Sequence, residues 1–204
     1  MAEGYATRTV SRSAFLELRE EEKLVNSGYE FLDEKRVQLA AEMLRQREAY
    51  REARARFLAA CEQASAALVE AASAEGLEAL QLLPAMPLGD ARTLIDERKF
   101  VGLTLLAARF EADDEQGGNL AASSGVVRDC SHAFREVVSL GVPLAALAAS
   151  LERLMHEYQR TERRVRALEN VILPEIRDEL ATMEEHVDLN EQEEVIRVRS
   201  IRRD

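Results

Sequence analysis

The sequence lacks tryptophan, and aromatic residues make up only 5% of its 204 residues. Proline occurs four times and cysteine twice. The two cysteines, Cys61 and Cys130, form no CxxC pair, which indicates free thiols in a reducing compartment. We therefore expect no disulfide-stapled secreted fold. The chain is rich in alanine, leucine, glutamate and arginine, and 32% of its residues are charged. This composition is typical of long helices and coiled coils.

The common catalytic and cofactor motifs are also missing. A P-loop needs a glycine directly before a lysine, and the sequence has no such pair. It contains no HExxH motif and no GxSxG motif, and its histidines, His132, His156 and His186, are scattered. We therefore expect no catalytic residue, no cofactor and no metal site, and we expect the chain not to be an enzyme by itself.

The charge balance and the lack of a recognisable signal segment limit the location and the partners. A net charge of −11 argues against nucleic acid, because binding phosphates requires a basic surface. Glu3, Arg8 and Arg12 interrupt any apolar signal segment. We take residues 101–108 as the longest nearly apolar stretch, which is too short to span a bilayer. The expectation is a cytoplasmic protein without direct membrane insertion.

The strongest pattern present is a heptad stripe between residues 15 and 71. Fourteen of its seventeen positions are apolar, and an apolar repeat of 3.5 residues keeps one face turned towards a partner helix. A helix of 57 residues is roughly 85 Å long, so it would project from any compact domain of this size. The positions are Phe15, Leu18, Glu22, Val25, Tyr29, Leu32, Arg36, Leu39, Met43, Gln46, Tyr50, Ala53, Phe57, Ala60, Ala64, Ala67 and Ala71.

The middle of the chain, residues 74–141, loses this pattern. Gly76, Pro84, Pro87 and Gly89 predict loops around a short helix at residues 77–83. β-Compatible residues at 95 and at 100–105, with a polar break at 96–99, predict a β-hairpin at about 93–111; a helix from 99 to 111 is the alternative. A helix resumes at residue 123, with an expected break near residues 141–143.

A second heptad stripe runs from residue 144 to residue 187. Near residue 172 its step changes to four and four, and this stutter unwinds a left-handed supercoil locally. Pro174 lies there and should bend the helix. We take as representative seam residues of the two stripes Leu18, Val25, Leu32, Leu39, Leu168, Ile172, Met183 and Val187.

In the simplest arrangement of the chain, the two stripes pair with each other as an antiparallel coiled coil. It predicts an all-α fold with an N-terminal shaft helix (1–73), a small central head (74–141) and a C-terminal shaft helix (142–204). Pairing Ala71 with Leu144 puts Arg12 beside Arg197. The two basic chain ends then meet at one tip, although solvated tails are the alternative. The residues of that tip are Arg8, Arg12, Arg197, Arg199, Arg202 and Arg203.

Three polar residues interrupt the first stripe: Glu22, Arg36 and Gln46. They are either edge positions whose stems cover the seam or buried polar groups that fix the register. In the antiparallel register chosen above, Glu22 falls near His186, and Arg36 falls near Glu169 or Glu175.

One stretch resembles a known family. Residues 161–174, TERRVRALENVILP, resemble the signature of the D subunit of V-type and A-type ATPases/ATP synthases, which carries R-R-V-N-A-L-E, an apolar run and a proline. The matching residues are Arg164, Val165, Ala167, Leu168, Glu169 and Pro174; Arg166 replaces the family's asparagine. Residues 7–8 (TR), residues 96–103 and the end of the chain from residue 193 resemble the family more weakly.

The resemblance implies a central rotor shaft. In that family the two terminal helices form an antiparallel coiled coil inserted into the hexamer of A and B subunits. The middle segment binds the F subunit and the adaptor on the membrane rotor ring. The chain would couple ATP hydrolysis or synthesis to proton or sodium translocation without binding nucleotide, and the hexamer-facing tip would be the basic cluster. A coiled-coil adaptor or tether, such as a flagellar-export stalk protein, is the alternative, and an amphipathic membrane-surface protein is a weaker one.

Overall fold

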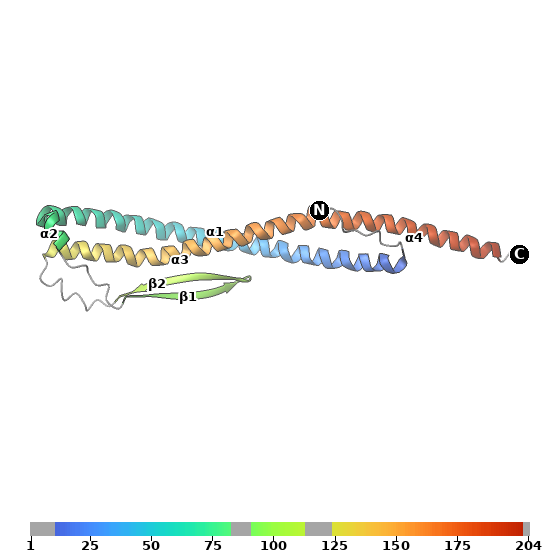
Figure 1. Ribbon diagram of the computed structural model, residues 1–204, viewed down its shortest axis with the longest axis horizontal. Coiled ribbons are helices and arrows are strands. Elements are labelled where there is room, and N and C mark those ends of the chain that lie inside the picture. The colour runs from blue at the N-terminus through green and yellow to red at the C-terminus, as the bar shows by residue number, and fades with distance from the viewer. Residues whose placement is uncertain (1–10, 83–90, 113–123, 202–204) are drawn as a thin grey trace. The chain divides into compact units, whose positions relative to one another are not determined.

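The computed structural model describes residues 11–82, 91–112 and 124–201. These residues form the helices α1 (Arg12–Glu75), α2 (Leu77–Leu82), α3 (Gly125–Ala167) and α4 (Leu173–Ile201), the π-helical turn η2 (Leu168–Ile172), and the strands β1 (Arg92–Phe100) and β2 (Leu103–Glu111) (Figure 1). The expected all-α fold with a long antiparallel helix pair and a small hairpin is confirmed. The chain divides into two units, Met1–Val37 with Tyr158–Asp204, and Gln38–Glu157.

Helix α1 has a defined start and end. The Ser11 side chain accepts a hydrogen bond from the backbone N–H of Ala14 at 3.1 Å, as an N-cap does. At the other end Gly76 has a φ of +85°, which is the left-handed conformation that glycine adopts at a helix C-terminus. Between these ends, none of the seventeen stripe residues is exposed, so the stripe is the packing face of α1.

In the first unit, α1 packs against η2 and α4. The core consists of Leu18, Ile176 and Met183, each at most 7% exposed. Val25 and Ile172 are partly buried against this cluster. The side chain of Leu32 is half-buried, as are those of Leu168 and Val187.

The stutter near residue 172 has a structural counterpart in η2. The backbone N–H of Leu173 bonds to the carbonyl of Leu168, five residues back, which is the pattern of a π-helical turn. This turn takes up the extra residue of the heptad pattern. It also lies just before Pro174, the second residue of α4, which has no N–H to donate and would crowd the carbonyl four residues earlier in a regular helix.

In the second unit, α1 and α3 pack side by side, and the hairpin lies along them (Figure 1). Leu39, Ala60, Ala64 and Leu154 are buried at the seam. A Cβ atom added to Gly141 would lie 3.3 Å from the ring of Phe57. The glycine therefore lets the two helices approach closely there.

Three expectations for this region are wrong. Helix α3 does not break near residues 141–143, because it continues through Pro143; packing along the helix outweighs the roughly 3 kcal/mol that an internal proline costs. The helical segment that leads to the C-terminus thus begins at Gly125. Residues 96–99 form no break either: they lie inside β1, and the turn is at Val101 and Gly102. Finally, the uncharged run at residues 137–151 is longer than residues 101–108.

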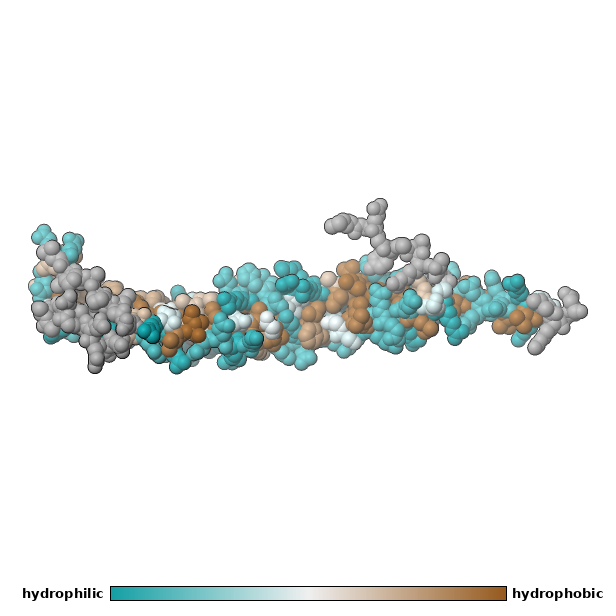
Figure 2. Space-filling view, turned by 60° about the horizontal axis from the view of Figure 1, so that its bottom comes forward, coloured by the Kyte–Doolittle hydropathy of each residue, from teal (hydrophilic) through white to brown (hydrophobic). Residues whose placement is uncertain are grey.

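That uncharged run lies in the helix Gly125–Ser200, the one helix in the described part of the chain that is long and apolar enough to cross a membrane by length and composition alone. Only 17% of its most apolar window is buried. Figure 2 shows hydrophobic residues among mostly hydrophilic ones on the visible face. The apolar surface of α3 therefore exceeds what α1 and the hairpin cover.

Candidate functional site

The hairpin is closed by a two-residue turn. Strands β1 and β2 pair antiparallel with Phe100 opposite Leu103, and Val101 and Gly102 have φ values of +45° and +83°. Two successive left-handed residues are typical of a type I′ turn, whose twist matches that of the strands. Glycine accepts this conformation freely, whereas a β-branched residue such as Val101 is strained there.

Helix α3 holds the outer edge of β2. The Ser150 hydroxyl accepts a hydrogen bond from the backbone N–H of Leu106 at 2.8 Å and donates one to the carbonyl of the same residue at 3.0 Å. The Arg153 guanidinium donates to the carbonyl of Thr104 at 2.9 Å. Ser150 is fully buried, so a single hydroxyl satisfies two edge groups that would otherwise be buried without partners.

Helix α1 holds β1 through a buried carboxylate. Glu42 is 7% exposed and forms ion pairs with Arg45, at 2.6 Å, and with Arg98 of β1. Gln46 also donates to it, at 2.9 Å. Burial alone would raise the pKa of Glu42, but the hydrogen bonds from Arg45 and Gln46 and the charges of Arg45 and Arg98 outweigh it and lower that pKa.

Arg98 and Leu105 form a cross-strand pair that faces the helices. Leu105 is 2% exposed, and the guanidinium of Arg98 lies 5.6 Å from the centre of the Phe100 ring, within cation–π range. The hairpin is therefore docked by the Glu42–Arg98 salt bridge, by the buried Leu105, and by the hydrogen bonds of Ser150 and Arg153. Sequence reasoning missed Glu42 and Ser150, because neither lies on a heptad stripe.

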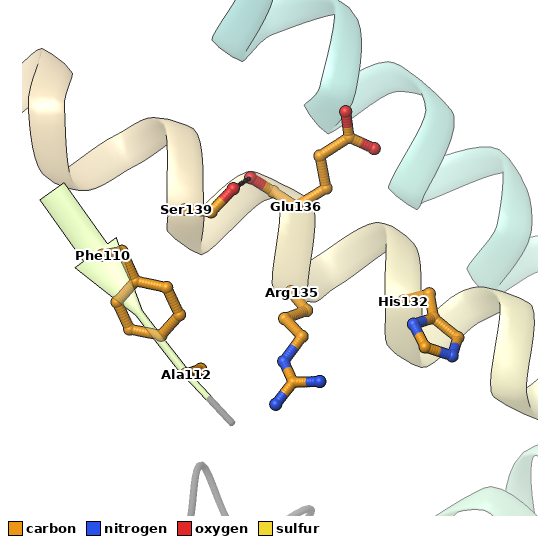
Figure 3. A pocket seen from close by; sticks show the side chains of 6 residues that line it. All are labelled: Phe110, Ala112, His132, Arg135, Glu136 and Ser139. Carbon is orange, nitrogen blue, oxygen red and sulfur yellow. Dashed lines mark hydrogen bonds between the residues drawn. The ribbon is translucent and has the colours of Figure 1, made fainter. Parts of the chain in front are cut away.

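A shallow cavity of about 300 Å³ lies where β2 meets α3 (Figure 3). Phe110 and Ala112 line it from the hairpin, and His132, Arg135, Glu136 and Ser139 from α3. Among the described residues, no group of histidine, cysteine or acidic side chains is arranged to hold a metal ion. The buried thiol of Cys130, whose pKa burial raises, is suited to packing rather than to reaction.

Near the start of α1 in the first unit, basic and acidic residues lie together. Arg12 of α1 pairs with Glu191 of α4 at 3.3 Å, and both side chains are exposed. Arg12 and Arg199 line the same open depression together with Glu191 and Glu194. Arg197 is exposed, while Arg8, Arg202 and Arg203 lie outside the described residues. The depression thus brings together two of the six tip arginines.

The helix register differs from the expected one. Arg12 forms an ion pair with Glu191 instead of lying beside Arg197. Glu22 pairs with Arg177 at 3.1 Å, not with His186. Arg36 contacts Asp33 and, at 3.4 Å, Glu162, not Glu169 or Glu175. The expected register assumed that the C-terminal helix starts after Pro143; because α3 starts at Gly125, every partner on α3 and α4 lies earlier in the sequence.

The residues that carry the family resemblance surround the π-helical turn. Val165 is fully buried and Leu168 half-buried, whereas Arg164, Ala167, Glu169 and Pro174 are exposed. Arg166, at the position of the family's asparagine, pairs with Glu162 at 2.7 Å. Glu162 therefore joins Arg166 on its own helix to Arg36 on α1, and this network lies directly before η2.

Comparison with known proteins identifies the family. The family model that describes the D subunit of ATP synthase matches residues 14–203. The chain belongs to this family. It is similar to the D subunit of the A-type ATP synthase of Pyrococcus abyssi, with 26% identity over 94% of this chain and 92% of the relative. The D subunit of the V-type ATP synthase of Anaeromyxobacter dehalogenans strain 2CP-1 is 28% identical over 94% of each chain.

A third relative matches over a shorter stretch. The D subunit of the A-type ATP synthase of Pyrococcus furiosus is 35% identical over 88 residues, which span 43% of this chain and 41% of the relative. Members of the family are subunits of ATP synthases, and hence parts of a larger complex. The resemblance inferred from residues 161–174 is therefore confirmed at the level of the family.

Proposed function

We propose that this chain is the central rotor stalk of a V/A-type rotary ATPase. It couples ATP hydrolysis or synthesis in the hexamer of A and B subunits to proton or sodium translocation by the membrane rotor. The observation that carries the proposal is the pair of long antiparallel helices in a chain whose family is the D subunit of ATP synthases. In each unit a packed apolar seam holds the helical segments together, as transmission of torque along paired helices requires.

The chain has a mechanical rather than a catalytic role in this proposal. It acts without cofactor or metal, and the catalytic sites belong to its partners. The exposed tip with Arg12, Arg197 and Arg199 enters the hexamer, while the hairpin and the neighbouring ends of α1 and α3 form the head. The head binds the F subunit and the adaptor on the rotor ring. The chain is then a peripheral part of the complex on the cytoplasmic side, with no nucleic-acid partner and no inserted segment.

A weakly paired tip suits a turning shaft. The Arg12–Glu191 pair is exposed, and exposed ion pairs contribute about 0.2–1 kcal/mol each. Deeply buried pairs between the tip and the hexamer would have to be broken at each step, at several kcal/mol each. The seam residues, by contrast, are buried or half-buried between the helices.

The test is assembly with purified A/B hexamer. We expect the full chain to co-elute with the hexamer in size-exclusion chromatography at one copy per ring. A chain ending at residue 194 should stay folded by circular dichroism but bind more weakly, and increasingly so at high salt. A full chain that never co-elutes with the hexamer would overturn the proposal and favour the adaptor alternative.

A further inference from the structure

Three arginines lie close together on the outer face of the first unit. Arg160, Arg163 and Arg164 of α3 are all exposed, and spacings of three and four residues put them on one face of the helix. Thr161 and Val165 from the same stretch are buried and lie on the other side of the helix. The face formed by the three arginines, which we call the arginine face, is therefore turned away from the packed seam.

The arginine face has no acidic partner among the residues that the structure describes. The two nearby arginines off this face are paired, because Arg36 and Arg166 both bind Glu162. The three arginines of the face form neither an ion pair nor a hydrogen bond within the described ranges. At a spacing of one helical turn from any of them, the one acidic residue is Glu157, which is half-buried.

This clustering is unfavourable for the helix itself. Like charges three or four residues apart destabilise a helix, and Arg160 has an arginine at both distances. The packing of the first unit gains nothing from these exposed side chains, and the whole chain carries a net charge of −11. A local cluster of unpaired positive charge on an acidic chain indicates an anionic partner outside the chain.

The surroundings of the cluster indicate the kind of anion. The same face continues with Ala167 and Val171, both exposed, and an apolar surface of this kind matches an amino-acid side chain better than a phosphate backbone. Nucleic acid would also be repelled by the charge of −11, since its binding needs an extended basic surface. A second copy would bring the same net charge against itself. A protein segment with carboxylates is the remaining match, because a guanidinium binds a carboxylate through two parallel hydrogen bonds.

We propose that the arginine face binds an acidic segment of a partner protein. The carboxylates of that segment pair with Arg160, Arg163 and Arg164, and an apolar residue beside them contacts Val171. The arginines are exposed, so the contact is reversible and weakens as salt rises. This inference stands on the charges of the first unit alone and holds whether or not the chain turns inside a ring.

The experiment is zero-length cross-linking with a carbodiimide, which joins an amine to a carboxylate in contact with it. The natural chain offers few amines, because lysine occurs only at positions 23, 35 and 99. Arg160→Lys, Arg163→Lys and Arg164→Lys are made singly in the full chain, within the complex purified from its host by a tag on this chain. We expect each to cross-link to one acidic segment of a partner protein.

The matched control is Arg19→Lys. Arg19 is exposed in the same unit but lies among acidic residues at positions 17 and 20–22. It therefore adds an amine of the same kind where the chain already supplies the carboxylates. We expect it to give no cross-link to the partner segment.

Charge variants measure the affinity for a synthetic peptide of the cross-linked segment. Arg163→Gln should weaken binding about tenfold, as the loss of a hydrogen bond between charged groups does, while Arg163→Lys should keep most of it. The effect of Arg163→Gln should shrink at high salt. Circular dichroism of the isolated chain should show an unchanged or slightly higher melting temperature for Arg163→Gln, because a like-charge contact is removed.

Several outcomes would overturn the proposal. They are cross-links into a second copy of the chain, cross-links only within the chain, no cross-link to an acidic segment, and equal cross-linking from position 19. Tighter binding of a single-stranded thymidine oligonucleotide than of the peptide, abolished by Arg163→Gln, would also overturn it, because phosphate would then be the ligand. Assembly with the A/B hexamer is measured separately, so its failure would leave these results unaffected.

Discussion

The two units pack their helices together with different kinds of residues. In the first unit, two helical segments are held by large side chains, Leu18, Ile176 and Met183, and by the cross-helix ion pairs of Glu22 and Arg36. In the second unit the seam of α1 beyond residue 53 is mostly alanine, and Ala60, Ala64 and Ala71 are buried there. Alanine buries little apolar area, and this is the unit in which a hairpin packs against the helices.

The two seams differ in how much stability their residues contribute. A seam of large residues suffices for a two-helix unit, because each buried leucine or methionine contributes roughly 1.5–3 kcal/mol. An alanine seam allows close approach of the helices but buries less apolar area per residue, and in this unit the hairpin adds further buried residues and hydrogen bonds. Ser150 and Glu42 connect the hairpin to α3 and α1.

The largest expected effect is that of Leu18→Ala in the first unit. Leu18 is 1% exposed, and truncating a buried leucine costs about 2–5 kcal/mol. Amide hydrogen exchange should speed up in α4 around Ile176 and Met183 but not in the hairpin. Leu24→Ala is the control, since Leu24 is 73% exposed and its loss should change stability by less than about 0.5 kcal/mol. Faster exchange in both units would contradict the separation drawn here.

The next effect is that of Ser150→Ala in the second unit. It leaves the N–H and the carbonyl of Leu106 without their shared partner, and each unsatisfied buried group costs about 1–3 kcal/mol. Hydrogen exchange of β2 should accelerate at least tenfold while α1 around Leu18 stays protected. Ser139→Ala is the control, because the Ser139 hydroxyl bonds only to a carbonyl of its own helix. Unchanged exchange in β2 would mean that Ser150 does not hold the edge.

A pH-dependent effect is expected from Glu42. Its pKa is lowered in the folded chain, so the stability that its ionised form contributes is present above the unfolded pKa and is lost as pH falls through the folded pKa. Glu42→Gln should cost about 1–3 kcal/mol at neutral pH and should flatten the acid-side decrease in hairpin protection. Glu48→Gln, at an exposed pair with Arg51, should do neither. An identical acid profile in wild type and Glu42→Gln would refute the role of Glu42.

The smallest expected effect is a stabilisation. Val101 occupies a left-handed position at φ +45°, and asparagine is well suited to that position of a type I′ turn. Val101→Asn should slow hydrogen exchange in β1 and β2, corresponding to roughly 1 kcal/mol of gain. Gly102→Ala, which places a side chain at φ +83°, is the matched opposite change and should speed exchange. A destabilising Val101→Asn would mean that the turn is not of this type.

The sequence alone predicted the packing face of α1 and the existence of the hairpin, because both depend on local periodicity and turn chemistry. It did not predict the register, since one wrongly placed helix start at Pro143 shifts every partner on the opposite helix. Ser150 and Glu42 were missed because their partners, Leu106 and Arg98, are distant in sequence. No local pattern distinguishes a buried serine that clamps a strand from one that faces solvent.

We propose that the chain turns inside a ring of A and B subunits. A reversible disulfide between the chain and the ring is the decisive test of that rotation. In a background of Cys61→Ser and Cys130→Ala, a cysteine replaces Arg199 on α4 and a second is placed in the facing surface of one of the B subunits. We expect the disulfide to lower ATP hydrolysis of the assembled complex at least tenfold, and dithiothreitol to restore it. Hydrolysis that continues unchanged with the disulfide formed would contradict the rotor account.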